Sequence, residues 1–356
     1  MRSVDLFCGA GGLTLGLENA GWDTILGVDH NASACLTYKA NFPDVHLIES
    51  DIKSVDFTKW RGDVDLVAGG PPCQPFSVAG RQLSFTDPRD CVPEFIRAVA
   101  ECSPNAFLME NVPGLASQKH RDYLELTIEK LASLGYNVTY SVLDAADYGV
   151  PQHRRRLFIV GIRDFEFTFP TPLYGPLGTS PYITSGEALE DSPADTPNRA
   201  KVTYAKKPVL RPQPWDGMLV NGGGRPINLA EPSQTIPASA GGNRTHIIDS
   251  TGVFVEYHRY LMSGGTPYEG IVPGVRRLTV RESARLQTFP DDYIFLGQTS
   301  SQYCQIGNAV PSRLSYVLTE SLRHQLMKGP LEVGVPKPSI PHQLSLLNLL
   351  SEPVTA

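Results

Sequence analysis

Short apolar runs alternate with amphipathic stretches along the first 164 residues of the chain. Continuous apolar runs of this kind are typical of strands buried on both faces. They predict strands over residues 3–7, 24–28, 45–49, 65–68, 106–109, 137–143 and 157–162. Apolar residues three or four positions apart predict helices over residues 13–20, 33–41, 94–101 and 120–134. Strands that alternate with helices predict an α/β fold around a mostly parallel sheet.

The composition of the chain changes at about residue 164. Residues 164–275 are rich in Pro, Gly, Thr and Ser and contain short strand-like pieces, such as residues 252–257. This composition predicts a separate, smaller, loop-rich domain. Helical periodicity returns over residues 279–287 and again beyond Pro311. We therefore expect a first domain over residues 1–164 that resumes over 276–328, a second domain over 165–275, and a tail over 329–356.

Charge and cysteine content narrow the class of protein. The 356 residues carry a net charge of −6, which argues against a uniformly basic surface but leaves room for a local basic cleft. The six cysteines form no Cys-x-x-Cys pair, so we expect neither a zinc site nor a disulfide framework. The sequence shows no charged-then-apolar leader and no apolar run of about 18 residues. We expect a soluble cytoplasmic protein with no membrane association.

Several polar or reactive residues fall where predicted strands end. In an open parallel sheet, ligands bind in the crevice outside the carboxyl ends of the strands. The residues at or just beyond those ends are Phe7, Asp29, Asp51, Cys73 and Glu110. Function is therefore to be sought at this edge of the predicted sheet.

A glycine-rich turn, CGAGG over residues 8–12, joins the first predicted strand to the first helix. Such a turn lets the backbone approach a ligand closely, and the N–H groups of the helix point at that ligand. Asp29 follows Gly9 by twenty residues, where nucleotide-binding folds grip ribose hydroxyls. The dinucleotide fingerprint is not met, because Thr14 stands where its last glycine should be. The pattern favours a nucleoside-type cofactor over a dinucleotide.

The stretch GGPPCQPFS over residues 69–77 follows the apolar run at 65–68. Its glycines and prolines end the strand and place Cys73 on a stiff, turned loop. Free cysteine is among the most often buried residue types, so a thiol in the core is one interpretation. A nucleophile at the edge of the crevice is the other.

Six segments together resemble the DNA (cytosine-5)-methyltransferases, from residue 1 to about residue 325. They occur in the order that the family shows. The segments are 5–12 (DLFCGAGG), 70–77 (GPPCQPFS), 110–112 (ENV), 152–156 (QHRRR), 276–290 and 305–310 (QIGNAV). The resemblance implies a Rossmann-like, S-adenosylmethionine-dependent methyltransferase sheet with a second, smaller target-recognition domain.

The resemblance implies four catalytic residues, and the chemistry explains each of them. Carbon 5 of cytosine is a poor nucleophile, and a thiolate from Cys73 that adds to carbon 6 would activate it. Glu110 would stabilise the charge that develops at N3 of the base. Arg156 would hold the O2 atom, and Arg154 would steady the cysteine loop and the phosphates, because arginine stays charged and offers a planar fork.

The implied cofactor is S-adenosylmethionine, with S-adenosylhomocysteine as product and no metal. By the family pattern Phe7 stacks on the adenine, Asp29 takes the ribose, and Asn308 closes the methionine end. Family members more often carry Glu where Asp29 stands, so this ribose contact departs from the pattern. The other residues that we expect at the cofactor are Gly9, Gly11, Gly12, Asp51, Ile52 and Pro71.

The implied partner is double-stranded DNA, from which the cytosine must be flipped because carbon 5 is inaccessible in the stack. Segments 232–237 (PSQTIP) and 241–244 (GGNR) resemble the family's recognition core, in which Thr235 meets the flipped nucleotide's backbone. Arg225 or Arg244 would grip guanine edges. Residues 74–90 resemble a loop that closes over DNA. The remaining expected DNA contacts are Gln74, Ser77, Arg81, Arg89, Gly241 and Gly242.

Three other functions compete with this interpretation. The same core could methylate cytosine in transfer RNA, although a recognition region of more than a hundred residues favours DNA. A catalytically silent DNA-binding relative need not keep all four catalytic residues. A dinucleotide oxidoreductase would leave the Pro-Cys-Gln segment unexplained. We expect a stand-alone, monomeric enzyme of a restriction–modification system, with a possible cognate restriction endonuclease acting on the same site.

Overall fold

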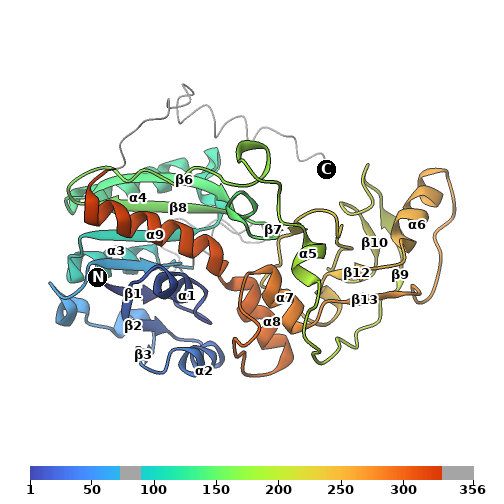
Figure 1. Ribbon diagram of the computed structural model, residues 1–356, viewed down its shortest axis with the longest axis horizontal. Helices are drawn as coiled ribbons and strands as arrows, with labels where there is room; N and C mark the ends of the chain where they lie inside the picture. Colours follow the sequence, from blue (N-terminus) through green and yellow to red (C-terminus); the bar gives the residue numbers. More distant parts are fainter. Residues whose placement is uncertain (73–89, 331–356) are drawn as a thin grey trace.

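A computed structural model describes residues 1–72 and 90–330 of the chain. The molecule has a larger lobe built on one sheet and a smaller lobe of short strands, which lie side by side in Figure 1. Cys73, which the sequence predicts as the nucleophile, and the residues from 331 onwards lie outside the described residues.

Seven strands form the sheet of the larger lobe. They are β1 (Arg2–Leu6), β2 (Asp23–Asp29), β3 (His46–Glu49), β4 (Leu66–Gly69), β5 (Ala106–Asn111), β6 (Asn137–Asp144) and β8 (Arg155–Ile162). Their order is β3-β2-β1-β4-β5-β8-β6. The first five run parallel, and β8 is antiparallel to both β5 and β6. The predicted α/β fold with a mostly parallel sheet is confirmed. The strand order reverses between β1 and β4, and ligands of such sheets bind at that switch point.

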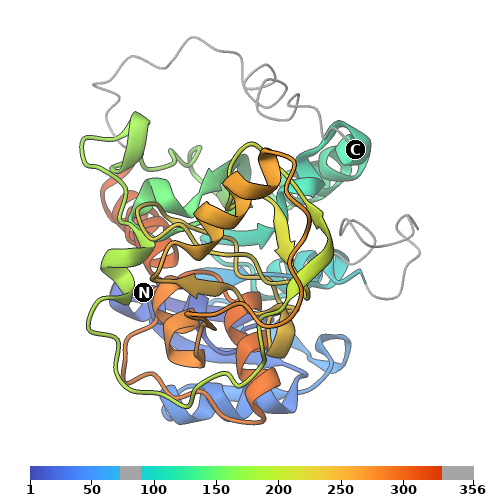
Figure 2. The same ribbon diagram turned by 90° about the vertical axis from the view of Figure 1, so that its right-hand side faces the viewer.

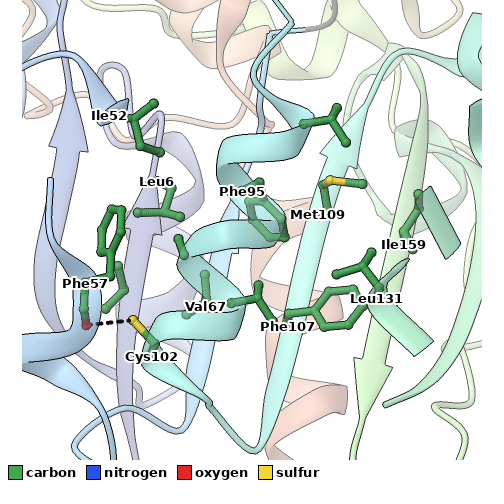
Figure 3. Packing of buried hydrophobic residues seen from close by; sticks show 14 of the residues in the cluster. Leu6, Ile52, Phe57, Val67, Phe95, Cys102, Phe107, Met109, Leu131 and Ile159 are labelled. Atoms are coloured by element: carbon green, nitrogen blue, oxygen red, sulfur yellow. Dashed lines mark hydrogen bonds between the residues drawn. The ribbon is translucent and has the colours of Figure 1, made fainter. Parts of the chain in front are cut away.

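Helices cover both faces of this sheet. The elements α3 (Val92–Cys102) and α4 (Arg121–Ser133) pack on one face, and α1 (Gly12–Asn19) and α9 (Ser312–Lys328) on the other. Figure 3 shows how α3 places Phe95 and Cys102 against strand residues such as Val67 and Phe107. The helix α2 (Ala32–Asn41) packs through Tyr38 on a third cluster, which contains aromatic residues from 289 to 295.

The C-terminal part of the chain returns to the N-terminal part. Helix α9 lies against α1, and the Trp22 indole N–H donates to the Thr319 carbonyl at 3.0 Å. A Cβ atom at Gly16 would lie 2.2 Å from the Ser315 hydroxyl oxygen, so only glycine permits this approach of the two helices. The elements α7 (Val280–Leu286) and α8 (Thr299–Asn308) lie between the sheet and the smaller lobe in Figure 1. The sequence pattern predicted α7 but not α8.

Short elements build the smaller lobe, which faces the viewer in Figure 2. They are α5 (Ser185–Leu189), β9 (Tyr204–Val209), β10 (Met218–Val220), β11 (Ser233–Gln234), β12 (Ile247–Asp249), α6 (Val253–Met262) and β13 (Val275–Arg277). The strands pair as β9 with β10, β12 with β13, and β11 with β7 (Gln152–His153) of the larger lobe. The pair β7–β11 is thus a backbone connection between the two parts of the molecule.

Residues 252–257 are not a strand-like piece, and that prediction is wrong. They form the beginning of α6, which buries Phe254, Tyr257 and Leu261 along one face. The Asp249 carboxylate accepts hydrogen bonds from the backbone N–H groups of residues 251–254, at 2.8 to 3.3 Å. This cap satisfies the free donors of the first helical turn, and it outweighs the strand preference of the β-branched and aromatic residues.

The model also contains short 3₁₀ turns between the main elements. They are η1 (Ile52–Ser54), η2 (Phe57–Trp60), η4 (Pro113–Ala116), η5 (Gln118–His120), η6 (Ala145–Tyr148), η7 (Gly175–Leu177) and η8 (Gly242–Arg244).

Candidate active site

A cavity of about 690 Å³ opens at the carboxyl ends of β1, β4 and β5. The lining comes from the residues at and after the carboxyl ends of β1, β2, β4 and β5, from Arg154 and Arg156 beside β8, from residues 237–238 of the smaller lobe, and from α8 with the residues after it. The cavity therefore sits at the switch point of the sheet, where the sequence placed the functional residues.

The turn after β1 forms one end of the cavity. Phe7 lines it with a φ of 58°, a left-handed conformation that is uncommon for any residue with a side chain. The Gly9 N–H donates to one Asp29 carboxylate oxygen at 2.8 Å, and the Asn31 N–H donates to the other at 2.8 Å. Asp29 thereby joins the loops after β1 and β2, and each of its oxygens can accept a further bond from a ligand.

Asp5 lines the same end, and the sequence analysis did not select it as a site residue. Its side chain is fully buried, and one carboxylate oxygen accepts a bond from the Thr14 hydroxyl at 2.6 Å. The other oxygen has no partner among the described residues. Burial, reinforced by the nearby Asp29 carboxylate, raises the pKa of Asp5 to about 7. An acidic residue inside the apolar strand was the signal in the sequence.

Glu110 and Arg156 face each other further along the cavity. The Arg156 Nε atom lies 2.9 Å from Oε1 of Glu110, and the two side chains are 16% and 14% exposed. Burial raises the pKa of Glu110, although the positive charges of Arg156 and Arg154 oppose that shift. The pair thus combines a carboxyl group that can hold a proton with a cation beside it.

Arg154 joins three parts of the chain around the cavity. It is 1% exposed, and its two terminal nitrogens donate to the Ile236 carbonyl at 3.1 Å and the Gly307 carbonyl at 2.8 Å. Burial and the neighbouring Arg156 lower the pKa of Arg154. The guanidinium holds the smaller lobe and α8 against β8, and its expected role toward the cysteine loop and the phosphates stays a prediction.

The loop that carries Cys73 begins at the cavity wall. Pro71 and Pro72 both line the cavity, and the Asn111 side-chain amide donates to the Pro71 carbonyl at 3.1 Å. A Cβ atom at Gly70 would lie 3.0 Å from Oε2 of Glu110, so a side chain at this position would crowd the Glu110 carboxylate. The expected site residues Cys73, Gln74, Ser77, Arg81 and Arg89 lie outside the described residues.

Gly12, at the end of the turn after β1, and Asn308, at the end of α8, also line the cavity. A Cβ atom at Gly12 would lie 2.4 Å from the Val310 carbonyl oxygen, so the glycine turn packs directly on the C-terminal segment. Asn308 is the exposed last residue of α8, where the sequence placed it on a turn.

Three residues expected at the cofactor are not among the described lining residues. Gly11 has a φ of 89° and packs on Phe42, which a Cβ atom would meet at 2.3 Å. Asp51 is exposed, and its side chain accepts a bond from the Lys53 N–H at 2.9 Å. Ile52 is 5% exposed and packs in the main core. The roles of these residues toward a cofactor remain predictions.

The described residues that we expect to contact DNA lie on the smaller lobe. Arg225 and Arg244 are exposed, and Gly241 and Gly242 have φ values of 132° and 51°. The Thr235 hydroxyl donates to the His153 carbonyl at 2.7 Å, so Thr235 lies directly beside strand β7 of the larger lobe. The contacts of these residues to DNA stay predictions.

Buried glutamines connect the elements around the site, and the sequence analysis gave them no role. The Gln152 amide donates to the Leu286 carbonyl at 3.1 Å and to the Gln287 side chain at 2.9 Å, and its oxygen accepts from the Ile236 N–H at 2.9 Å. Gln287 donates to the Ile306 carbonyl at 2.6 Å. Because a buried amide needs several partners, only the folded arrangement reveals why glutamine is present.

Metal and membrane features are readily checked in the described part of the chain. No group of three or more His, Cys, Asp or Glu side chains within residues 1–72 and 90–330 could hold a metal ion. None of the described helices has the length and apolar composition that crossing a membrane requires.

The fold and the cavity define an α/β protein with a binding cavity at the switch point of its sheet. A family model described as C-5 cytosine-specific DNA methylase matches residues 1–324. The Type II methyltransferase M.PspPI of Psychrobacter sp. (strain TA137) is 36% identical over 360 residues, which cover 93% of this chain and 80% of that protein. M.Eco47II of Escherichia coli is 36% identical over 356 residues, covering 91% and 79%.

Solved structures share the fold at lower sequence identity. A DNMT2 variant from Spodoptera frugiperda aligns with a TM-score of 0.69 at 20% identity and covers 90% of this chain and 99% of that chain. The Dnmt2 methyltransferase of S. pombe aligns with a TM-score of 0.64 at 18% identity, covering 91% and 98%.

The chain belongs to the C-5 cytosine-specific DNA methylase family. It is a DNA cytosine-5 methyltransferase of the restriction–modification type, as its Type II relatives indicate. The resemblance that six motif segments carried is confirmed. Members of this family use S-adenosylmethionine as methyl donor.

Proposed function

We propose that the protein transfers a methyl group from S-adenosylmethionine to carbon 5 of a cytosine flipped out of duplex DNA at a short recognition sequence. One observation carries this proposal: a single cavity is lined by both the glycine turn and the Glu110–Arg156 pair. A cofactor held at the turn would therefore face a base held at the pair. Flipping is required because the duplex stack conceals carbon 5.

The residues at the turn fit this cofactor. S-adenosylmethionine carries a positively charged sulfonium and supplies an electrophilic methyl group when bound. Asp5, with its unpartnered buried oxygen, and Asp29 provide negative charge at the same end of the cavity. Phe7 offers an aromatic face, and Asn308 offers an amide at the far wall. We assign the cofactor contacts to these residues and to the backbone of Gly9 and Gly12.

The residues at the other end fit the base. We propose that the Cys73 thiolate adds to carbon 6, and that electrons move toward N3, where Glu110 stabilises the developing charge as a proton donor. Carbon 5 then bonds the methyl group, and the methyl–sulfur bond breaks to leave S-adenosylhomocysteine. Loss of the carbon 5 proton to a base expels the thiolate and restores the aromatic ring. Arg156 would hold O2 of the base beside Glu110.

Replacement of the proposed nucleophile tests this sequence of steps. Cys73→Ser should abolish methyl transfer and leave cofactor binding unchanged, because a hydroxyl at neutral pH is a far weaker nucleophile than a thiolate. Transfer is followed with labelled S-adenosylmethionine, and cofactor affinity by calorimetry. Retained transfer by the serine variant would remove Cys73 from the mechanism.

Substrate and biological role are tested by one labelling experiment. Purified protein receives labelled S-adenosylmethionine with either mixed-sequence duplex DNA or bulk transfer RNA, and the product is mapped by bisulfite sequencing. We expect label at carbon 5 of cytosine within one short DNA motif. Label in RNA alone would support the RNA alternative, and label in neither would support a silent DNA-binding relative.

The role in restriction–modification is tested on the same motif. We propose that methylation protects host DNA from a cognate restriction endonuclease. DNA from cells that express the protein should resist nucleases that cleave the mapped motif, and DNA from cells with Cys73→Ser should be cut. Equal cutting of both DNAs would contradict the protective role.

A further inference from the structure

His246 directly precedes β12 in the chain. In space its side chain lies between Arg225 and Thr235, two residues that the proposed function assigns to DNA. It is 5% exposed, and both of its ring nitrogens have partners. The Arg225 N–H points at Nδ1 at 3.3 Å, and Nε2 lies 3.1 Å from the Thr235 carbonyl oxygen. Because an N–H can only donate and a carbonyl can only accept, these partners require a neutral ring with its proton on Nε2.

The two partners of His246 make further hydrogen bonds, and one of these bonds reaches the larger lobe. The Arg225 carbonyl accepts from the Ile247 N–H at 2.9 Å, so both backbone polar groups of Arg225 are held. On the other side, the Thr235 hydroxyl donates to the carbonyl of His153 at 2.7 Å. His153 directly precedes Arg154, which bridges the smaller lobe and α8. A continuous series of bonds thus runs from Arg225 to the active site.

We propose that His246 is a positioning residue that couples recognition of the DNA sequence to the active site by fixing the spacing between Arg225 and Thr235. The inference rests on the proposed function, in which Arg225 reads base edges and Thr235 meets the flipped nucleotide. A bidentate arginine contact discriminates between bases only when its backbone is held in place. The imidazole ring of His246 is rigid and is hydrogen-bonded through both nitrogens. It therefore holds the backbone at Arg225 at a fixed distance from the backbone at Thr235.

The charges around His246 keep its ring neutral. Burial lowers the pKa of His246, and the positive charges of Arg225 and of Arg277 on β13 act in the same direction. The segment around residue 235 contributes the Thr235 carbonyl, which favours a protonated Nε2. Protonation of Nδ1 would place two N–H donors opposite each other at Arg225. The coupling should therefore be complete above the ordinary histidine pKa of about 6.5 and fail only as the pH falls through the lowered pKa of the buried ring.

Two substitutions of His246 each keep one of the two hydrogen bonds that its ring makes. In His246→Gln the side-chain amide can still reach the Thr235 carbonyl but no longer accepts from Arg225, whereas His246→Asn favours the bond from the Arg225 N–H. The chain supplies a matched control in His258, a second buried histidine of the smaller lobe, which is 8% exposed and bonds the Arg211 carbonyl at 2.7 Å. His258→Asn has no bond to either proposed DNA contact.

The experiment compares the motif that the wild-type protein selects by binding from a random duplex library against the same duplex with one base pair changed. Dissociation constants are measured for both duplexes from pH 8 to the lowest pH at which the protein stays folded, and S-adenosylmethionine affinity and thermal unfolding are measured in parallel. We expect both His246 variants to lose roughly tenfold of the discrimination at pH 7.5, the effect of one lost hydrogen bond, while His258→Asn keeps it. Wild-type discrimination should fall as the pH passes through the lowered pKa of His246, and discrimination by the two His246 variants should not.

The outcomes separate this inference from the proposed function. Full discrimination by both His246 variants would overturn the inference, and so would an equal loss of cofactor affinity and discrimination, which would indicate general loosening. If the variants fail to fold, a wild-type discrimination that does not change from pH 8 down to the lowest pH at which the protein stays folded overturns it. Binding discrimination does not depend on chemistry, so absence of methyl transfer counts against the proposed function alone.

Discussion

Glu110 illustrates how the environment of a single residue gives it a chemical role. Its carboxyl group is buried enough for its pKa to rise, yet Arg156 lies within hydrogen-bonding distance. Burial favours the protonated acid, which can donate its proton to a ring nitrogen. The positive charge of Arg156 then stabilises the carboxylate that remains after the proton has been donated. The two opposing influences suit a group that must gain and lose a proton in one cycle.

Glu110→Gln tests this role. Glutamine has the same shape and can still accept from Arg156, so the fold should persist, but it cannot transfer a proton. We expect the chemical step to slow by about 10²- to 10⁴-fold, the usual contribution of general acid–base catalysis. Single-turnover methyl transfer measures the step, and thermal unfolding controls for structure. Glu125→Gln, on the exposed side of α4, serves as the control, and an unchanged rate for Glu110→Gln would exclude Glu110 from the mechanism.

Asp5 gives a second prediction at the scale of one residue. The pKa of Asp5 is raised to about 7, from about 3.9 in an unfolded chain, so the folded state holds this proton more tightly. Its contribution to stability is therefore complete at low pH and is lost as the pH rises from about 4 to 7. The side chain in Asp5→Asn does not titrate, so the variant does not lose this stability. At pH 8 and without cofactor, we expect its free energy of unfolding to exceed that of the wild type by a few kcal/mol.

Urea unfolding at pH 5 and pH 8 measures this difference, with the exposed Asp292→Asn as control. The same Asp5 variant should bind S-adenosylmethionine more weakly, because a neutral amide no longer faces the cation. A stability difference that is equal at the two pH values would show that Asp5 is ionised normally in the folded protein.

Some site residues could be predicted from the sequence and others could not. Glu110 directly follows the apolar run of residues 106–109, so an acid near the end of β5 stands out in the sequence. Asp5 lies within such a run, where the pattern predicts only core. His246 owes its role to partners 11 and 21 residues away, and no local pattern places them beside it. Contacts that only the tertiary structure creates are the ones that the sequence analysis missed.

At the scale of elements, strands and helices were predicted where a local apolar pattern marks them and were missed where contacts in the tertiary structure stabilise them. The strands of the parallel sheet are buried on both faces and are therefore continuous apolar runs. Helix α8 escaped prediction because its inward-facing residues include Gln305, whose amide bonds Ser33 and Leu296 instead of packing as an apolar group. Helix α6 depends on the cap from Asp249, which lies outside the helix that it stabilises.

The contact between α1 and α9 gives a prediction at this scale. Alanine favours a helix over glycine by about 1 kcal/mol, so Gly16→Ala should stabilise α1 if propensity decided the outcome. The Cβ atom would instead lie 2.2 Å from the Ser315 hydroxyl oxygen and 2.5 Å from the Tyr316 backbone nitrogen. Separating the helices costs about 1–3 kcal/mol, so we expect net destabilisation. Urea unfolding measures it, with the exposed Asn19→Ala of the same helix as control, and a more stable Gly16→Ala would show that the helices separate freely.

At the scale of the whole molecule, the site is assembled from parts that are distant in the sequence. The cavity requires the strand ends, residues 237–238 and the end of α8 together, and Arg154 bonds the Ile236 carbonyl of the smaller lobe and the Gly307 carbonyl of α8. The composition change near residue 164 indicated a second domain, but it did not reveal this junction. The lobe contacts also pass the predicted boundary at residue 275, since β13 extends to Arg277, whose side chain donates to the Thr245 carbonyl at 2.6 Å.

The charge of the whole molecule leads to the last prediction. With a net charge of −6, the protein as a whole repels DNA, and if this repulsion dominated, added salt would screen it and strengthen binding. We expect the opposite, because affinity depends on the few cations that replace counterions along the phosphates, with Arg225 and Arg244 among the exposed candidates. The logarithm of the binding constant should fall linearly with the logarithm of salt concentration, and each lost phosphate contact should reduce the slope by roughly one. Titrations between 50 and 300 mM salt with wild type and Arg244→Gln measure both slopes. A flat or rising dependence would mean that the folded protein presents no basic surface to the duplex.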